Sequence, residues 1–152
     1  MPTVANGIDE LRSLAGKDLG AGGWLEVTQD RVNTFADATG DHQWIHVDVE
    51  RARTGPFQGT IAHGYLTLAL LIPMWTEILQ IEGVRMSINY GLNRVRFPSP
   101  VPVGAKVRLH ARVASVEDVS GSGVQLTAEF TVERQGGEKP AAVAEAVYRY
   151  YA

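Results

Sequence analysis

The spacing of apolar residues predicts helices in the first part of the chain. In TQDRVNTFADATGD, Val32 and Phe35 recur at the spacing of one helical face, between Thr28 and Gly40. Threonine is a common N-cap, and glycine is the usual residue just past the end of a helix. We therefore predict a helix between these two residues, with Asp41 at the start of a loop.

Two more helices are expected before the periodicity changes. DVERART can form a short helical turn with Asp48 as its N-cap, and it must end by Gly55 because the residue before a proline disfavours helical backbone. The segment IAHGYLTLALLIPMWTEILQ, which starts at Ile61, is apolar on nearly every side, which is typical of a helix buried all round. Pro73 lacks a backbone donor and should kink this helix or end its first part.

Alternating apolar and polar residues predict strands in the later part of the chain. KVRLHARV from Lys106 and VQLTAEFTV from Val124 show this alternation, which is typical of a strand with one solvent-facing side. A stretch suited to a hairpin, EDVSGSG, lies between them, and AVAEAVYRYY supplies a last strand. The basic outward residues of the first strand suit pairing with Glu129 and Glu133, so we expect an antiparallel meander.

Helices followed by long strands predict an α+β fold. Because the helix that starts at Ile61 is apolar on nearly all sides, we expect the antiparallel sheet to wrap around this long central helix, as in a hot-dog fold. No repeat or linker divides the sequence, which favours a single domain over residues 1–152. One such unit leaves sheet edges and one side of the helix uncovered, which favours a homodimer that extends the sheet.

Composition narrows the classes of partner. The hydrophobic fraction of 45% with 20% charged residues is typical of a globular protein, and a net charge of -3 favours neither nucleic acid nor an anionic membrane. The absence of cysteine excludes disulfides, thiolate metal sites and cysteine nucleophiles. We see no signal peptide and no apolar run long enough to span a bilayer, so we expect a soluble, cytoplasmic protein without nucleic-acid or membrane partners.

Candidate chemistry lies in GDHQWIHVD, where Asp41 and His46 are five residues apart. Taken alone, this stretch is explained more simply by a turn acid and a partly buried histidine. A carboxylate and an imidazole that a loop turns inward can, however, hold a water and move its protons near neutral pH. In AHGY, Gly64 at a helix start offers an unobstructed N–H to an oxygen that gains negative charge. Close helix–sheet packing would also explain this glycine.

The other three histidines have simpler explanations. His110 lies in the polar register of a strand and is expected on the surface, without a role. His42 follows the loop acid and could be solvated. His63 opens the buried helix and is expected to be at least partly enclosed.

The loop and the helix start together resemble a known family. GDHQWIHVDVERA resembles the signature of the R-specific enoyl-CoA hydratases, the MaoC-like dehydratase family, which is G-D-x-N-P-[LIV]-H followed by five residues and a small one. Asp41 and His46 match its acid and histidine, Ile45 its aliphatic position and Ala52 its small residue. IAHGYLTLAL resembles the central helix of the family, with Gly64 at its oxyanion glycine.

The resemblance implies reversible hydration of trans-2-enoyl-CoA to (R)-3-hydroxyacyl-CoA. Asp41 and His46 would hold the attacking water and share its proton transfers, while the Gly64 N–H would bind the thioester oxygen. No metal or other cofactor is implied, because coenzyme A is part of the substrate. The phosphates of coenzyme A need basic residues, and the nearest in sequence are Arg94, Arg96, Lys106 and Arg108. An acyl carrier protein could use the same surface.

Three residues depart from the family pattern, one of which is Ala38, where a larger aliphatic residue is common. Gln43 and Trp44 stand where asparagine and proline are usual, so the shape of the loop and of the acyl pocket is expected to differ. Two other functions stay open, namely a hot-dog acyl-CoA thioesterase and a non-catalytic acyl-binding or scaffolding subunit. The sequence also leaves open the acyl chain length, homo- or heterodimerisation, and which of Asp41 and His46 takes the first proton.

Overall fold

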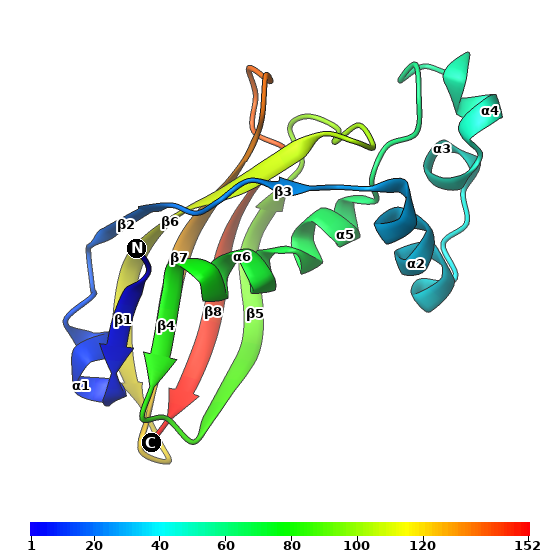
Figure 1. The fold of residues 1–152 in the computed structure, drawn as a ribbon. Helices are drawn as coiled ribbons and strands as arrows, with labels where there is room; N and C mark the ends of the chain where they lie inside the picture. The colour runs from blue at the N-terminus through cyan, green and yellow to red at the C-terminus, as the bar shows by residue number, and fades with distance from the viewer.

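A curved antiparallel sheet and the helical segment against its concave face organise the structure (Figure 1). The computed structural model describes residues 1–152. The six-stranded sheet has the order β2-β6-β7-β8-β5, and β3 pairs with β6 beside β2. Its strands are β2 (Asp18–Ala21), β3 (Leu25–Glu26), β5 (Met86–Arg96), β6 (Lys106–Val119), β7 (Gly123–Arg134) and β8 (Ala142–Tyr151).

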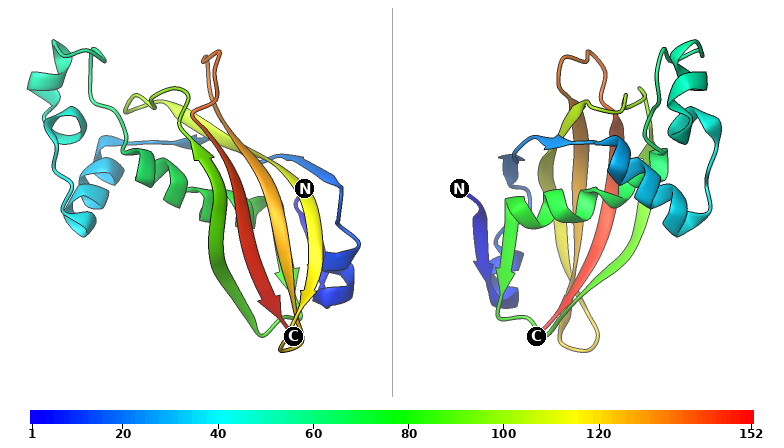
Figure 2. Two further views of the ribbon diagram at one scale, coloured as in Figure 1. Left: turned by 180° about the vertical axis from the view of Figure 1, so that it is seen from behind. Right: turned by 45° about the vertical axis from the view of Figure 1, so that its right-hand side comes forward.

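The helices fall into three groups. The first is α1 (Gly7–Arg12), and the second comprises α2 (Gln29–Thr39), α3 (Trp44–Val47) and α4 (Val49–Arg53). The second group projects beyond one end of the sheet (Figures 1 and 2). The third group is the central segment, α5 (Gly64–Ala69) and α6 (Leu71–Ile78), which lies across the concave face. A separate two-stranded parallel sheet joins β1 (Thr3–Asn6) to β4 (Leu79–Glu82).

The expected meander is confirmed, and with it the α+β hot-dog arrangement. Strands β6, β7 and β8 pair antiparallel in sequence order, and Arg108 and Arg112 lie opposite Glu133 and Glu129. The Arg108–Glu133 pair is separated by 2.7 Å and the Arg112–Glu129 pair by 3.2 Å. The alternation correctly identifies the buried face, whose residues include Val107, Leu109, Ala111, Val113, Val124, Leu126, Ala128, Phe130 and Val132.

The central helix differs from the expectation in two ways. It is divided at Leu70, because the ring nitrogen of Pro73 cannot donate to the carbonyl four residues earlier. The prediction that it is buried all round is wrong, since Tyr65 is 74% exposed and Ile72 is 40% exposed in this chain. No helix in the structure, this one included, combines the length and the hydropathy needed to cross a membrane.

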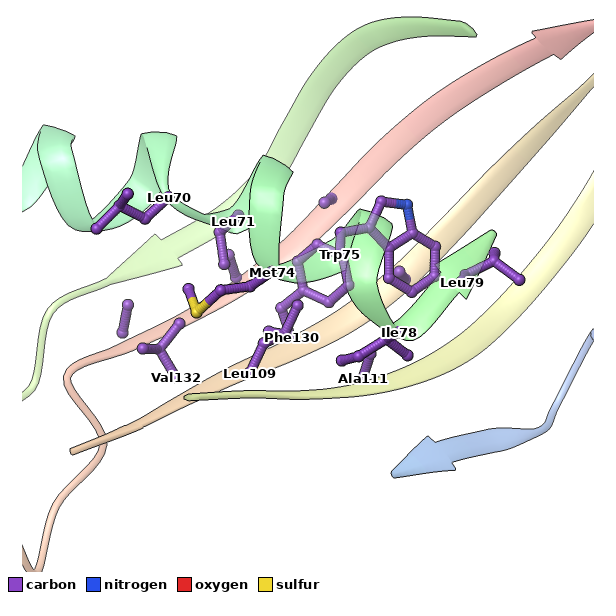
Figure 3. Close-up of a cluster of buried hydrophobic side chains, with 14 of the residues drawn as sticks. Leu70, Leu71, Met74, Trp75, Ile78, Leu79, Leu109, Ala111, Phe130 and Val132 are labelled. Carbon is purple, nitrogen blue, oxygen red and sulfur yellow. The ribbon is translucent and has the colours of Figure 1, made fainter. Parts of the chain in front are cut away.

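Apolar contacts hold the central segment against the sheet (Figure 3). Replacing a large buried side chain in such a core by alanine typically costs about 2–5 kcal/mol. The contact therefore fixes where the segment begins and ends relative to the strands. Figure 3 labels, from the segment and the chain just after it, Leu70, Leu71, Met74, Trp75, Ile78 and Leu79, and from the strands Leu109, Ala111, Phe130 and Val132.

The caps predicted for α2 and α4 are confirmed. The Thr28 hydroxyl accepts a hydrogen bond from the N–H of Arg31 (3.1 Å), and Gly40 ends α2 with a φ of 81°. The Asp48 carboxylate accepts from the N–H of Arg51 (3.1 Å) at the start of α4. These caps set the ends of the segment that carries Asp41.

Two buried tyrosines sit where the central segment meets β8. The indole N–H of Trp75 donates to the hydroxyl of Tyr150 over 3.1 Å. Burial raises the pKa of Tyr150 to about 12, although the hydrogen bond from Trp75 acts in the opposite direction. Burial also raises the pKa of Tyr148, and the neighbouring Tyr150 adds to this effect.

Alkaline unfolding should report this burial. An unfolded tyrosine ionises near pH 10, so the stability contributed by neutral Tyr150 is fully present below pH 10 and is lost as the pH rises towards 12. Tyr150→Phe should lower the unfolding free energy by about 1–3 kcal/mol at pH 8, because the Trp75 N–H loses its acceptor. It should also make the decline between pH 10 and 12 less steep. Urea unfolding at several pH values checks this, and an unchanged slope would contradict it.

Candidate active site

The loop after α2 and the short helix α3 carry the two residues singled out as acid and base. Asp41 directly follows the Gly40 cap and is exposed, whereas His46 in α3 is 6% exposed. Ligand atoms of Asp41, His46 and His63 all lie within 4.8 Å of one another. The structure therefore brings Asp41 and His46 together and adds a third side chain to them.

The His46 ring has a defined orientation. Its Nδ1 lies 2.7 Å from the carbonyl oxygen of Ile61. Because a carbonyl can only accept, Nδ1 carries the hydrogen of the neutral ring and Nε2 keeps a lone pair. The backbone carbonyl of His46 accepts from the Gln29 amide (2.8 Å), which itself accepts from the Thr60 hydroxyl (2.7 Å). Helix α2 therefore helps to hold α3 in place.

His63 is the site residue to which the sequence assigned no role. It is 2% exposed, so the expectation that it is enclosed is confirmed. Its ring stacks on that of His46, with 3.9 Å between centroids and 23° between planes. Its Nε2 lies 2.9 Å from the Asp41 carbonyl oxygen and donates to it. The only sequence signal was its place beside the glycine in AHGY.

The second ring nitrogen of His63 has no partner. Since Nε2 carries the hydrogen, Nδ1 keeps a lone pair, and this atom is buried without a hydrogen bond. An unpaired buried acceptor costs about 1–3 kcal/mol.

Gly64 begins α5, as the sequence predicted. Its N–H donates to no acceptor within the chain, so this donor is free. Close packing also applies, because a Cβ at this position would lie 3.2 Å from the nearest carbon of the Phe97 ring. The two explanations that the sequence left open are therefore compatible. The role of Gly64 as a donor to substrate stays a prediction.

A cavity of about 340 Å³ has His46 and Gly64 in its wall. Phe57 and Phe97 also line it, and the wall is largely apolar apart from the imidazole, the helix start and the hydroxyl-bearing residues Thr67 and Ser99. A larger cavity of about 580 Å³ lies along α6, β4 and β5, but neither a histidine nor a carboxylate lines it. We assign the site to the smaller of these two cavities, because His46, which lies close to Asp41 and His63, is in its wall.

Packing of Trp44 replaces the proline of the signature. The Arg51 guanidinium lies 4.2 Å from the Trp44 ring centroid. On another side the ring approaches Gly55, where an added Cβ would lie 3.0 Å from it. The loop is thus held by contacts with α4 and the chain after it rather than by a fixed backbone angle.

The four basic residues considered for coenzyme A do not form one cluster. Arg94 and Arg96 lie on β5, whereas Lys106 and Arg108 lie on β6, and β7 and β8 separate these strands. Arg108 is also engaged by Glu133 and lies 4.4 Å from the centroid of the Trp24 ring. Closeness in sequence was misleading because the order of strands in the sheet differs from their order in the chain.

The remaining two histidines contact exposed carboxylates. Nε2 of His110 lies 2.8 Å from an Asp18 carboxylate oxygen, and Nε2 of His42 lies 3.0 Å from one of Asp37. The pKa of Asp18 is lowered, mainly by the hydrogen bond from the Gly20 N–H and then by His110. His110 is therefore on the surface, as expected.

The three clustered side chains can be considered as metal ligands. Asp41, His46 and His63 are close enough in distance. The two imidazole rings, however, are stacked with 23° between their planes, so their in-plane lone pairs lie in separate, nearly parallel planes. Tetrahedral coordination needs ligands that converge on one point. The donor set fits a metal poorly. The absence of a metal cofactor stays a prediction from the sequence.

Comparison with known proteins gives a consistent set of relatives. Residues 11–134 match the family model described as MaoC like domain. Over 145 residues the chain is 53% identical to 3-hydroxyacyl-thioester dehydratase Z of Mycobacterium tuberculosis. The match covers 95% of this chain and 96% of that protein. It is 44% identical over 137 residues to nodulation protein N of Rhizobium leguminosarum bv. viciae, covering 89% of this chain and 85% of that one.

Solved structures agree with this comparison. The (R)-hydratase from A. caviae involved in PHA biosynthesis superposes with a TM-score of 0.67 at 26% identity, over 88% of this chain and 94% of that chain. These similarities extend over most of the described residues, including the loop with Asp41 and His46.

Proposed function

The chain belongs to the MaoC-like domain family, and we propose that it interconverts trans-2-enoyl-CoA and (R)-3-hydroxyacyl-CoA. The observation that carries this proposal is the approach of the Asp41 carboxylate and the His46 imidazole to within 4.8 Å. The free N–H of Gly64 lies in the wall of the cavity that His46 also lines. A similar relative named as a 3-hydroxyacyl-thioester dehydratase supports the same reaction class.

Each step of hydration has a group to serve it. Asp41 and His46 Nε2 hold a water whose oxygen attacks C3 of the enoyl thioester as the pair takes its proton. The electrons of the C2–C3 double bond move towards the thioester oxygen, and the Gly64 N–H stabilises the negative charge that develops there. The same pair returns a proton to C2 as the carbonyl re-forms, so the net change is addition of one water.

The geometry also supports the stereochemical part of the proposal. Asp41 reaches solvent while His46 is enclosed, so water can enter beside the carboxylate and be held on one side of the substrate. A water held on one face by both groups favours syn addition. The R configuration is proposed from the resemblance to the R-specific signature and from the similar (R)-hydratase structure.

Substitution of the pair should abolish turnover without unfolding the protein. Asp41→Asn and His46→Gln keep the approximate shape of each side chain but remove its proton transfer, so kcat should fall by about 10²- to 10⁴-fold. The assay is loss of the conjugated enoyl-thioester absorbance with short and medium trans-2-enoyl-CoA. Asp37→Asn and His42→Gln are matched controls, because these two side chains form an exposed contact close by in sequence. Both control variants should keep full turnover.

Other outcomes of this assay identify the competing functions. The product should be accepted by an R-specific and not by an S-specific 3-hydroxyacyl-CoA dehydrogenase. Thiol release from a saturated acyl-CoA would instead show a thioesterase. Binding of enoyl-CoA without turnover would indicate an acyl-binding subunit. Faster turnover with acyl carrier protein thioesters would indicate that this protein, and not coenzyme A, carries the acyl group.

Removal of metal ions should leave turnover unchanged. The proposed mechanism assigns water activation to Asp41 and His46, and coenzyme A takes part only as a portion of the substrate. Dialysis of the purified protein against EDTA, followed by the same absorbance assay, checks this. Activity that disappears on dialysis and returns with an added divalent cation would contradict it.

We also propose that two copies form a homodimer through β5 and the exposed side of the central segment. Strand β5 ends the strand order, so one of its edges has no partner within the chain. Beside it, Tyr65, Ile72 and Leu92 are exposed and line one shallow cavity. An unpaired edge next to apolar side chains suits a second copy of the same surface.

A charge at this surface should dissociate the dimer. Ile72→Glu would bury a carboxylate at the proposed interface, and Val49→Glu is the matched control because Val49 is similarly exposed but lies on α4. Light scattering should give the mass of two subunits for the wild type and for Val49→Glu, and one subunit for Ile72→Glu. A wild-type mass of one subunit at working concentration would contradict the proposal.

A further inference from the structure

We infer that His63 is a positioning residue that holds Asp41 and His46 in register with the Gly64 N–H, an inference that rests on the hydration proposed for this site. Three contacts of one buried ring carry it. His63 itself transfers no proton in this scheme. It acts through the groups that contact the substrate.

The first contact ties the acidic loop to the central segment. The Nε2–H of His63 donates to the backbone carbonyl of Asp41 over 2.9 Å. The side chain of Asp41 is otherwise held only by a long hydrogen bond of 3.4 Å from the N–H of Gln43. His63 therefore supplies the tighter of the two constraints on this acid, and it comes from the element that carries Gly64.

The second and third contacts hold the ring of the base. The His63 ring lies between the rings of His46 and Phe35, with centroid separations of 3.9 Å and 4.8 Å respectively. The Ile61 carbonyl fixes the Nδ1 edge of His46, and the stack with His63 fixes the plane of the ring. Together they leave Nε2 of His46 a single direction in which to accept a proton.

Covalent adjacency completes the arrangement. His63 is the N-cap residue of α5 and directly precedes Gly64. A displacement of the His63 ring would therefore change the separation between the water-holding pair and the proposed oxyanion donor. Small misplacements of this kind lower rates because the reacting atoms must be nearly aligned before reaction.

The unpaired Nδ1 of His63 favours a hydrogen-bonding role for this side chain over a role in filling space alone. Nδ1 of His63 is buried without a hydrogen-bond partner, which disfavours the folded state. A phenylalanine could fill the same space between the two rings without leaving a buried lone pair. The histidine is therefore better explained by its hydrogen bond to Asp41 than by stability.

Two substitutions separate the hydrogen bond from the ring. His63→Phe keeps a ring between His46 and Phe35 but cannot donate to the Asp41 carbonyl, whereas His63→Gln offers an amide N–H without a ring. We expect His63→Phe to lower kcat by about 10²-fold at unchanged KM, with the thermal midpoint equal to or above that of the wild type. His63→Gln should keep more of the turnover than His63→Phe.

Combination with Asp41→Asn tests whether the effect passes through the acid. If His63 acts by placing Asp41, His63→Phe should reduce the residual rate of Asp41→Asn by much less than 10²-fold. Hydrogen exchange of the segment 40–45 should also become faster in His63→Phe and less so in His63→Gln. A purely structural role would instead lower the thermal midpoint.

The outcomes distinguish the two proposals. Full kcat in His63→Phe would overturn the inference, and so would a loss of rate that adds completely to the loss in Asp41→Asn. In either case, turnover by the wild type would leave the proposed function intact. Unchanged exchange in the segment 40–45 would also count against the positioning role. No wild-type turnover with any enoyl thioester would refute the proposed function, and the positioning role of His63 would be refuted with it.

Discussion

The contact between α6 and the concave face of the sheet is the interaction on which the rest of the structure depends. Apolar side chains such as Met74 and Trp75 lie against Leu109 and Phe130, and this contact sets the position of the whole central segment (Figure 3). Because α5 leads directly into α6, the same contact determines the position of the Gly64 N–H. The position of the proposed oxyanion donor at one end of the segment is therefore set by hydrophobic packing at the other end.

The site itself is assembled from two pieces of chain that meet beyond the end of the sheet. One is the loop and short helix after α2, and the other is the start of α5. Backbone carbonyls join the two, since that of Ile61 accepts from His46 and that of Asp41 accepts from His63. The result is two enclosed imidazoles beside an exposed carboxylate, so the proposed water can reach the site beside that carboxylate.

The departures from the family signature show how the same loop can be held by different means. Proline would restrict the backbone angle, whereas Trp44 restrains the loop by packing between Arg51 and Gly55. His63 also holds the loop, through the hydrogen bond from its Nε2 to the Asp41 carbonyl, but its buried and unpaired Nδ1 disfavours the folded state. The loop is therefore held by packing of Trp44 and by a hydrogen bond to a buried side chain that itself keeps an unsatisfied nitrogen, and such local conflicts are typical of functional sites.

Features that depend on neighbours along the chain could be predicted from the sequence alone. The caps of α2 and α4 and the buried face of β6 and β7 follow from residue spacing and local hydrogen bonding. The alternation also predicted that basic residues of β6 would pair with Glu129 and Glu133, although only the structure gave the partners. Contacts between distant segments depend on how elements pack. Only the tertiary structure decided the parallel pairing of β1 with β4, the exposure of Tyr65 and the stacking of His63 on His46, because local periodicity carries no information about which distant segment covers a given face.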